Sequence, residues 1–227
     1  MAAPGANEMV VVVTGGDPID PAHVRALPPF VHVIAADSGI EHAQALGLAI
    51  DLAVGDFDSV APEALARAEA TGAVVERHPT AKDATDLELA LDAATALQPS
   101  RIHVLGGHGG RLDHLLANAM LLAAPAYAAV DITAEMGRAR LTIVRTVAEL
   151  TGPIGALVSL VPLHGTAERV TTSGLLFPLD AEDLHPGSTR GISNELVRPS
   201  ASIRVERGVL VAIQPGSLGP HHQELLR

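Results

Sequence analysis

The sequence predicts an α/β fold: a three-layer α/β/α domain with a mostly parallel sheet, followed by a small all-β sandwich domain. In roughly the first 145 residues, short apolar runs alternate with segments of helical pattern. Continuous apolar runs are typical of strands buried on both faces of a parallel sheet, and their alternation with helices predicts three layers. Beyond Thr151 the chain has only short β-type runs separated by turn residues, which is typical of an all-β domain.

The strands expected in the first domain are mostly apolar, and they are Met9–Thr14, Val31–Ala36, Leu52–Val54, Ala73–Glu76, Ile102–Leu105, Val130–Thr133 and Leu141–Val144. The helices expected between them are Ile40–Leu46, Pro62–Thr71, Thr85–Leu97 and Leu112–Ala123. The third helix places Leu87, Leu91 and Ala94 on one face. Asp83 is expected to cap its N-terminus, and Asp86 lies in its first turn, where a carboxylate interacts favourably with the helix dipole.

The change of pattern predicts a first domain over residues 1–147 and a second over residues 148–227. A turn-forming segment, Thr151-Gly152-Pro153-Ile154-Gly155, precedes the expected strands Ala156–Val161, Glu168–Thr172, Leu175–Leu179, Ala201–Val205 and Val209–Ile213. A β domain of this size has only a small core of its own. We therefore expect it to pack on the first domain or on a partner subunit, with residues 215–227 as a mobile tail.

Composition excludes several classes of protein. The formal net charge is −11, which does not suit a nucleic-acid surface, because phosphate backbones require clustered Lys and Arg. The absence of Trp leaves no obvious stacking platform for single strands. Without cysteine there are no disulfides, thiolate nucleophiles or Cys-based zinc sites. The N-terminal apolar run is too short for a signal peptide or membrane span, so we expect a cytoplasmic protein without membrane contact.

Four short acidic motifs carry most of the functional information, and they are Asp37-Ser38-Gly39, Gly55-Asp56-Phe57-Asp58-Ser59, Lys82-Asp83-Ala84-Thr85-Asp86 and Gly109-Gly110-Arg111-Leu112-Asp113-His114. The first two follow apolar runs directly, and the last follows one within a few residues. The ends of such runs meet along one edge of a parallel sheet, where ligands bind in open α/β folds. Carboxylates gathered there repel one another unless a cation lies among them, and Mg²⁺ prefers carboxylate and phosphate oxygens. The motifs therefore predict a site for a metal–nucleotide phosphate.

Each motif also has a purely structural explanation. Asp56 and Asp58 point to the same side of extended backbone and can both reach one cation, but aspartate also forms turns. Asp83 and Asp86 could serve only to cap a helix. Lys82 could be an ordinary surface lysine or a phosphate contact.

A glycine-rich turn, Gly106-Gly107-His108-Gly109-Gly110-Arg111, joins the strand Ile102–Leu105 to a helix. Glycines let the backbone approach a ligand closely, a helix N-terminus favours anions, and an arginine fork suits phosphate. The turn is neither a Walker A loop nor a dinucleotide-binding fingerprint. Its sequence therefore favours an anion site without identifying the ligand.

The residues around this turn have alternatives of their own. Asp113 could pair with Arg111 or His114, and Asn118 could form a buried structural hydrogen bond. Thr14-Gly15-Gly16-Asp17 could make a simple turn or lie beneath a nucleotide. No serine stands in a Gly-x-Ser-x-Gly elbow, so a hydrolase triad is not expected.

Together and in this order, these segments resemble the thiamine pyrophosphokinase family. The resemblance covers roughly residues 9–213 and extends into the β-rich part at residues 159–163, 172–175 and 193–195. Its most specific feature is the Gly-Asp-Phe-Asp-Ser motif combined with the Asp-x-Thr-Asp and Gly-Gly-Arg-x-Asp-His motifs. The resemblance implies an ATP-binding α/β catalytic domain and a thiamine-binding β sandwich. It also implies a homodimer with active sites between the catalytic domain of one subunit and the β domain of the other.

The resemblance implies Mg²⁺-dependent transfer of a diphosphoryl group from ATP to the hydroxyethyl arm of thiamine, with release of AMP. The metal ligands that it implies are Asp56, Asp58 and Asp86. The catalytic residues that it implies are Asp56, Asp58, Asp83, Asp86 and Arg111. The implied ATP-binding residues are Gly15, Asp37, Gly39, Lys82, Gly109, Gly110, Arg111, Asp113 and His114. The implied thiamine-binding residues are Lys82, Asp86, Ser193 and Asn194.

The chain departs from the family pattern at the acceptor side. Some members stack an aromatic residue of the last β strand on thiamine, and that position lies near Val211 here. The thiamine site is then more aliphatic, or Phe177 contributes to it. The alternatives are a diphosphokinase for another hydroxymethyl heterocycle such as a pterin, a non-enzymatic nucleotide or thiamine diphosphate sensor, and a metal-dependent phosphohydrolase.

Overall fold

The computed structural model describes residues 8–81 and 83–216, and it divides into two compact units. The first unit contains the described residues up to Leu121 together with Ala129–Gly137. The second contains Leu122–Ala128 and the described residues from Arg138 onward. The expected mobile tail lies mostly outside the described residues, and the assignment of ATP and thiamine binding to separate domains stays a prediction.

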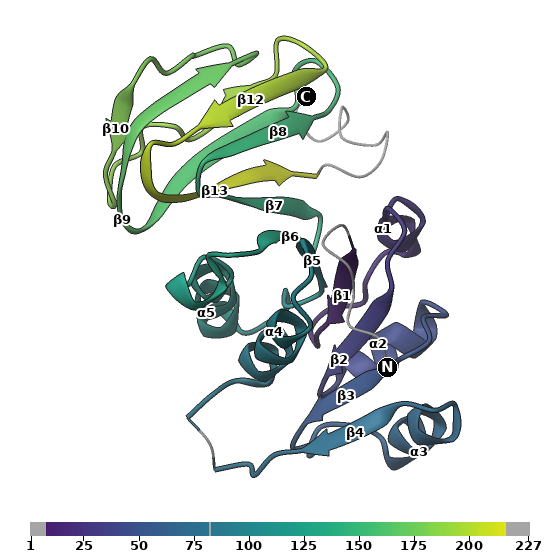
Figure 1. The fold of residues 1–227 in the computed structure, drawn as a ribbon. Coiled ribbons are helices and arrows are strands. Elements are labelled where there is room, and N and C mark those ends of the chain that lie inside the picture. Colours follow the sequence, from purple (N-terminus) through teal and green to yellow (C-terminus); the bar gives the residue numbers. More distant parts are fainter. Residues whose placement is uncertain (1–7, 82, 217–227) are drawn as a thin grey trace. The chain divides into compact units, whose positions relative to one another are not determined.

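The first unit is a parallel sheet with the strand order β4-β3-β2-β1-β5-β6 (Figure 1). The strands are β1 (Met9–Val13), β2 (His32–Ala36), β3 (Leu52–Gly55), β4 (Val74–Arg77), β5 (Arg101–Leu105) and β6 (Asp131–Met136). Each neighbouring pair in this order is parallel. The chain first builds outward from β1 to β4 and then returns to the other side of β1 with β5. The strand order therefore reverses at the boundary between β1 and β5.

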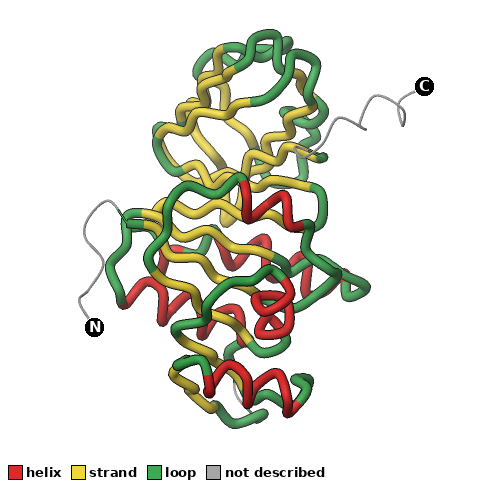
Figure 2. Tube along the Cα trace, turned by 90° about the vertical axis from the view of Figure 1, so that its right-hand side faces the viewer, coloured by secondary structure: helices red, strands yellow, loops and turns green. Residues whose placement is uncertain are grey.

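Helices cover both faces of this sheet (Figures 1 and 2). They are α1 (Pro21–Arg25), α2 (Gly39–Ala45), α3 (Pro62–Ala70), α4 (Asp86–Ala96) and α5 (Leu112–Leu122). Side chains alternate along β1, so Val11 and Val13 pack in one core cluster with Ile40 of α2 and Leu65 of α3. The sheet is buried on both faces because Val10 and Val12 are fully buried as well.

The second unit consists of antiparallel strands with the order β7-β13-β9-β12-β8. These strands are β7 (Ala139–Val144), β8 (Val147–Thr151), β9 (Leu157–Ser173), β12 (Ser200–Arg204) and β13 (Arg207–Pro215). Two short strands, β10 (Glu182–Leu184) and β11 (Asn194–Glu195), also pair with β9. The 17-residue strand β9 pairs with β13 at positions from Ser159 to Glu168 and with β12 at Thr171–Ser173, so this one strand contacts both neighbours.

The expected fold class is confirmed as α/β with a C-terminal β domain, but the fold as a whole is mixed rather than mostly parallel. Parallel pairing is confined to the first unit, and the second unit is antiparallel. Figure 2 shows the α-helices in red gathered in the first unit. No helix in the part of the chain that the structure describes has both the length and the hydropathy to cross a bilayer.

Several expected elements need correction. The separately expected strands Ala156–Val161 and Glu168–Thr172 form one strand, β9, because the intervening His164 and Gly165 take positive φ angles without ending it. Leu175–Leu179 is not a strand and makes only an isolated bridge from Leu175 to Leu196. The helix α1 and the short strands β8, β10 and β11 are not predicted from the sequence.

Candidate active site

A cavity of about 440 Å³ lies at the carboxyl edge of the first unit's sheet. Its walls come from the loops after β1, β2, β3 and β5 and from the N-terminal turns of α4 and α5. This position is the point where the strand order reverses, which is where open α/β sheets bind ligands. The four acidic motifs predicted from the sequence all contribute to it, with Asp58 beside its wall.

An acidic cluster forms one side of the cavity. Asp37, Asp56 and Asp58 each place a carboxylate oxygen so that the three oxygens lie within 4.8 Å of one another. Asp86 approaches from α4, since a Cβ atom added at Gly55 would lie 3.2 Å from its Oδ1 and 3.3 Å from the Asp37 side chain. Carboxylates from the ends of two adjacent strands and from one helix thus converge on one point.

Asp37 is the most constrained member of this acidic cluster. Its backbone lies in the left-handed region with φ of 45°, a conformation that aspartate and asparagine tolerate better than most residues. Burial raises the pKa of Asp37, and the negative charges of Asp86, Asp56 and Asp58 raise it further. Its Oδ1 is shielded from solvent and has no hydrogen-bond partner among the described residues.

These residues fit a hard divalent cation. All the donors are carboxylate oxygens, which Mg²⁺ prefers, and a cation would satisfy the orphaned Oδ1 of Asp37. The sequence suggested Asp56, Asp58 and Asp86 as ligands. The structure adds Asp37, which joins Asp56 and Asp58 in a group whose oxygens lie within 4.8 Å of one another, with Asp86 alongside. Sequence reasoning did not select Asp37 as a metal ligand because β2 and β3 neighbour each other only in the folded sheet.

The glycine-rich turn after β5 interlocks with the loop after β1. Gly107 donates a backbone hydrogen bond to the Gly15 carbonyl at 2.8 Å. A Cβ atom at Gly106, whose φ is 98°, would lie 2.3 Å from the Thr14 carbonyl oxygen. Only glycine therefore permits this approach of two backbones, and the cavity floor depends on it. Gly109, Gly110 and Gly15 line the cavity as expected, while Gly39 is buried against β1 at the start of α2.

Arg111 and Asp113 form an exposed pair at the start of α5. The Nε and Nη2 atoms of Arg111 donate to the two carboxylate oxygens of Asp113 at 2.9 and 2.7 Å. The guanidinium holds the pKa of the Asp113 carboxyl well below its usual range. Arg111, His114 and Asn118 line the cavity, and Asn118 donates from Nδ2 to the Gly107 carbonyl. The predicted structural bonds of Asp113 and Asn118 are therefore both present.

The N-terminus of α4 needs one correction. The N-cap is Thr85, whose hydroxyl accepts a hydrogen bond from the Glu88 amide, and not Asp83. Asp83 is exposed and lies outside the cavity lining, whereas Thr85 and Asp86 line the cavity. Lys82, predicted to contact phosphate and thiamine, lies outside the described residues. Thr85 and His108 are lining residues that the sequence prediction did not select, although both stand inside its motifs.

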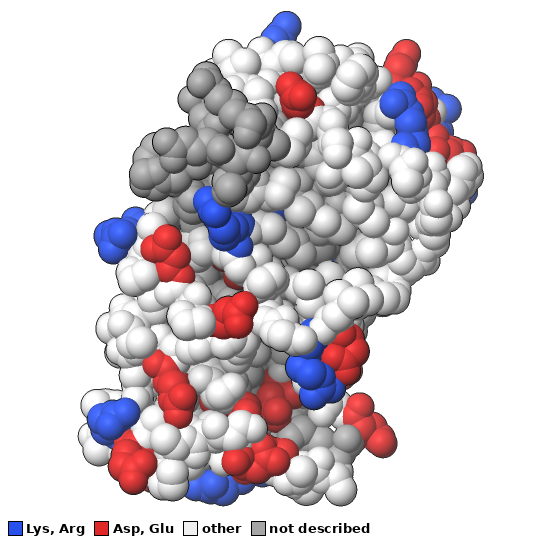
Figure 3. Space-filling model, turned by 180° about the vertical axis from the view of Figure 1, so that it is seen from behind, with Lys and Arg blue, Asp and Glu red and all other residues white. Residues whose placement is uncertain are grey.

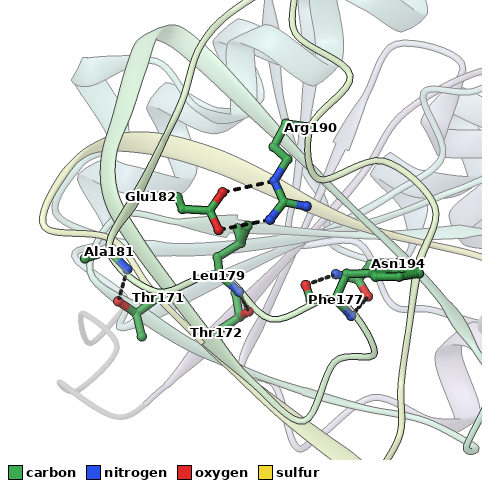
Figure 4. Close-up of polar contacts among 8 residues, drawn as sticks. All are labelled: Thr171, Thr172, Phe177, Leu179, Ala181, Glu182, Arg190 and Asn194. Atoms are coloured by element: carbon green, nitrogen blue, oxygen red, sulfur yellow. Dashed lines mark hydrogen bonds and ion pairs between the residues drawn. The ribbon is translucent and has the colours of Figure 1, made fainter.

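In the second unit, a buried asparagine fixes the loop that carries Phe177 (Figure 4). Asn194 is 3% exposed; its Oδ1 accepts from the Phe177 amide at 3.0 Å, and its Nδ2 donates to the Phe177 carbonyl at 2.7 Å. Phe177 itself is 56% exposed, and Ser193 is exposed with φ of 55°. The position near Val211, where some family members carry an aromatic residue, is only 2% exposed in this chain, and a contribution of Phe177 to the thiamine site stays a prediction.

Two protein-family models match the chain. The model for "Thiamin pyrophosphokinase, catalytic domain" matches residues 29–134, and that for "Thiamin pyrophosphokinase, vitamin B1 binding domain" matches residues 143–210. Thiamine pyrophosphokinase of Bacillus subtilis is 30% identical over 190 residues, covering 80% of this chain and 86% of that protein. The chain belongs to the thiamin pyrophosphokinase family.

Solved structures of thiamin pyrophosphokinases have the same fold. That of the Bacillus subtilis enzyme superposes with a TM-score of 0.81 at 28% identity, covering 93% of this chain and 100% of that one. The Geobacillus thermodenitrificans structure gives a TM-score of 0.77 at 28% identity, covering 94% and 99%. The Candida albicans structure, at 14% identity, has a TM-score of 0.73 over 92% and 89% of the two chains, and it shows the shared fold alone.

Proposed function

We propose that this protein is a thiamine pyrophosphokinase, which transfers diphosphate from ATP to thiamine and releases AMP. The observation that carries the proposal is the convergence of Asp37, Asp56, Asp58 and Asp86 opposite Arg111 in the cavity of a chain that belongs to this family. Nothing in the structure favours a pterin diphosphokinase, a sensor or a phosphohydrolase.

The charges of the cavity support a requirement for Mg²⁺. Among its described lining residues, Asp37, Asp56 and Asp86 are acidic, and Arg111 is the only lysine or arginine. Triphosphate would be repelled by this wall unless a cation accompanied it. Asp37, Asp56 and Asp58 would hold the ion, with Asp86 as the further ligand implied by the family resemblance. A bound Mg²⁺ supplies charge neutralisation at the phosphoryl oxygens.

The protein's own residues supply alignment and electrostatics, which carry most of the rate in phosphoryl transfer. Arg111 is suited to offset negative charge on the diphosphoryl group and on the leaving AMP, with Lys82 in the same role. Arg111 would exchange Asp113 for phosphate oxygens, or contact them with its remaining N–H groups. Asp86 or Asp83 would orient the thiamine hydroxyl and accept its proton late in the transfer.

The second unit offers a surface for the acceptor. Phe177 is exposed, and Asn194 fixes its backbone through two hydrogen bonds. Ser193, which directly precedes Asn194 in the chain, is exposed as well. An aromatic face attracts a cationic heterocycle, and the thiazolium of thiamine is one. We propose Phe177 and Ser193 as thiamine contacts, with Asn194 supporting them through its backbone bonds.

We also propose a homodimer whose active sites combine the first unit of one subunit with the second unit of its partner. Helix α5 supports a subunit contact, because Leu112, Leu116 and Met120 are all exposed and follow one another at a spacing of four residues. That spacing places them on one helical face, where an apolar stripe ordinarily packs against another element.

The direct test is to incubate the protein with ATP, Mg²⁺ and thiamine and to detect the products by mass. Thiamine diphosphate and AMP in equal amounts are the expected result. AMP formed only with a pterin acceptor would identify the other diphosphokinase. Free phosphate or diphosphate without an acceptor would indicate a hydrolase, and ligand binding without any product would indicate a sensor.

A further inference from the structure

Phe57, which stands between two aspartates of the acidic cluster, has a backbone conformation that is rare for its residue type. Its φ is 60°, in the left-handed region, where a bulky side chain is seldom found and glycine is the ordinary residue. The extended backbone expected from the sequence is therefore absent between Asp56 and Asp58. The chain turns there instead, and the Asp58 amide donates to Oδ1 of Asp56 at 3.2 Å. The convergence of the two carboxylates thus depends on the conformation of Phe57.

The side chain of Phe57 is held by two sets of contacts. It is 8% exposed and belongs to the core cluster that also contains Ile40 of α2 and Leu65 of α3. Cζ of Arg77 lies 5.2 Å from the centroid of its ring, which is the distance of a cation–π contact. Arg77 is itself fixed, because it ends β4 and pairs in register with Gly55 of β3. The ring is therefore anchored both in the core and at the end of the neighbouring strand.

The anchored ring explains how a strained turn persists at this position. A left-handed backbone at a residue other than glycine is retained only where the surrounding structure holds it. Glycine would adopt the same φ without strain, but it has no side chain that could fix the turn. Phenylalanine supplies the turn together with its anchor. Because an ion binds more tightly when its ligands are already held in place, such an anchor raises the affinity of the acidic cluster for a cation.

We propose that Phe57 is a positioning residue, whose anchored ring maintains the left-handed turn and so keeps the carboxylates of Asp56 and Asp58 on one divalent cation. Phe57 is not among the residues that line the cavity, and it acts only through its two neighbours in the chain. The inference rests on the proposed function for the presence of the cation. It goes beyond that function because it concerns how the free protein prepares the site before any substrate binds.

The test measures binding of Mn²⁺, which takes the same oxygen ligands as Mg²⁺ and whose unbound ion is counted by electron paramagnetic resonance. Phe57→Leu and Phe57→Val both keep an apolar side chain, but a β-branched residue tolerates a positive φ least. Phe57→Leu should bind Mn²⁺ within about threefold of wild type, whereas Phe57→Val should bind it about 10-fold more weakly or worse, as for loss of a group that orients a metal ligand. Phe57→Gly permits the turn without the anchor and should weaken binding by about 10-fold as well.

Ile50→Ala is the matched control for a general loss of stability. Ile50 is 7% exposed in the same core cluster, but it precedes β3 and so lies at the opposite end of that strand from the turn. Its truncation should lower the Tm and leave the affinity for Mn²⁺ within about twofold of wild type. Weakening by Ile50→Ala as large as that by Phe57→Val would overturn the inference.

Wild-type affinity in either Phe57→Val or Phe57→Gly would also overturn the inference. If circular dichroism shows that Phe57→Gly does not fold, Phe57→Val alone decides the question. A wild-type protein that binds no Mn²⁺ would contradict the inference too, although thiamine diphosphate formed by the same preparation would leave the proposed function intact. Conversely, the expected Mn²⁺ affinities without any product would count only against the proposed function.

Discussion

The ionised side chain of Asp37 lowers the stability of the metal-free protein. Its raised pKa means that the folded state favours the protonated form, so the stability linked to Asp37 is present at low pH and lost as pH rises through the raised value. At neutral pH, ionised Asp37 therefore destabilises the metal-free protein. Divalent cation should relieve this effect by pairing with the carboxylates.

We predict that Asp37→Asn raises the Tm of the metal-free protein at neutral pH by about 2 °C or more and diminishes the further rise caused by Mg²⁺. Asparagine suits the left-handed backbone at this position, so the change removes charge without strain. Thermal unfolding with and without Mg²⁺ measures both effects. The advantage of the variant should vanish toward pH 3.8, the ordinary pKa of the group. A lower Tm for the variant at neutral pH would contradict this account.

Asp58 tests catalysis separately from stability. It is exposed, and its side chain accepts a hydrogen bond only from its neighbour Ser59 among the described contacts. We predict that Asp58→Ala lowers kcat by about 100-fold or more, as expected for loss of one electrostatic stabiliser, with little change in unfolding free energy.

Asp131→Ala is the matched control for Asp58→Ala. Asp131 is another exposed aspartate, at the N-terminal end of β6 and thus at the opposite edge of the sheet from the cavity. Its removal should leave steady-state rates unchanged. Near wild-type turnover of Asp58→Ala would contradict the proposed catalytic role of the acidic cluster.

At the level of single residues, the sequence predicted which chemical groups form the site better than it predicted which residues lie next to one another there. The spacing of Asp56 and Asp58 after a strand predicted that both can reach one cation but left a simple turn as the alternative, and the structure places one oxygen of each within 4.8 Å of the other. The closeness of Asp37 to them depends on the pairing of β2 with β3, which spacing along the chain does not reveal. Likewise, Val211 and Phe177 are both apolar, and only the folded β domain shows that the first is buried and the second exposed.

Among the elements, the glycine-rich turn makes the sharpest prediction. We expect Gly106→Ala to destabilise the protein by about 2 kcal/mol or more, because its φ is positive and a Cβ atom would collide with the Thr14 carbonyl. Gly110→Ala, in the same turn, meets no atom within 4 Å and should change the free energy of unfolding by less than about 0.5 kcal/mol. Urea unfolding of the two variants measures the difference, and equal effects would show that the two loops are not interlocked.

Elements were predictable where a long apolar pattern specified them. The helices α2 to α5 end within one or two residues of the expected positions, and the strands β1 to β5 do likewise, because burial on both faces requires an unbroken apolar run. Strand β6 continues to Met136, three residues beyond its expected end. The failures are short elements such as α1 and β11, which carry too few residues for a pattern. The sequence predicts two strands where β9 is one, because turn-type residues usually end a strand, whereas β9 continues through His164 and Gly165 with positive φ angles.

For the molecule as a whole, the proposed sharing of sites between subunits predicts complementation. Asp58→Ala removes a group of the first unit, and Phe177→Ala removes one of the second. If each site uses one unit from either subunit, a heterodimer of the two variants contains one intact site. Mixing equal amounts under exchange should then restore about a quarter of wild-type activity.

Each variant must be nearly inactive alone, and sedimentation should show that both remain dimeric. No recovery after proven subunit exchange would mean that each site lies within one chain. A monomeric wild-type protein would exclude the shared site altogether.

The pairing of β13 with both β7 and β9 has a consequence for synthesis on the ribosome. Residues Arg207–Pro215 are translated after β7 and β9, and these two strands have no neighbour on that edge until β13 emerges. All described residues of the first unit precede Arg138 in the chain. A nascent chain therefore can fold its phosphate site early while its β domain stays incomplete. A premature stop codon just before Arg207 would accordingly produce a chain with exposed strand edges, prone to aggregation, rather than a shortened enzyme.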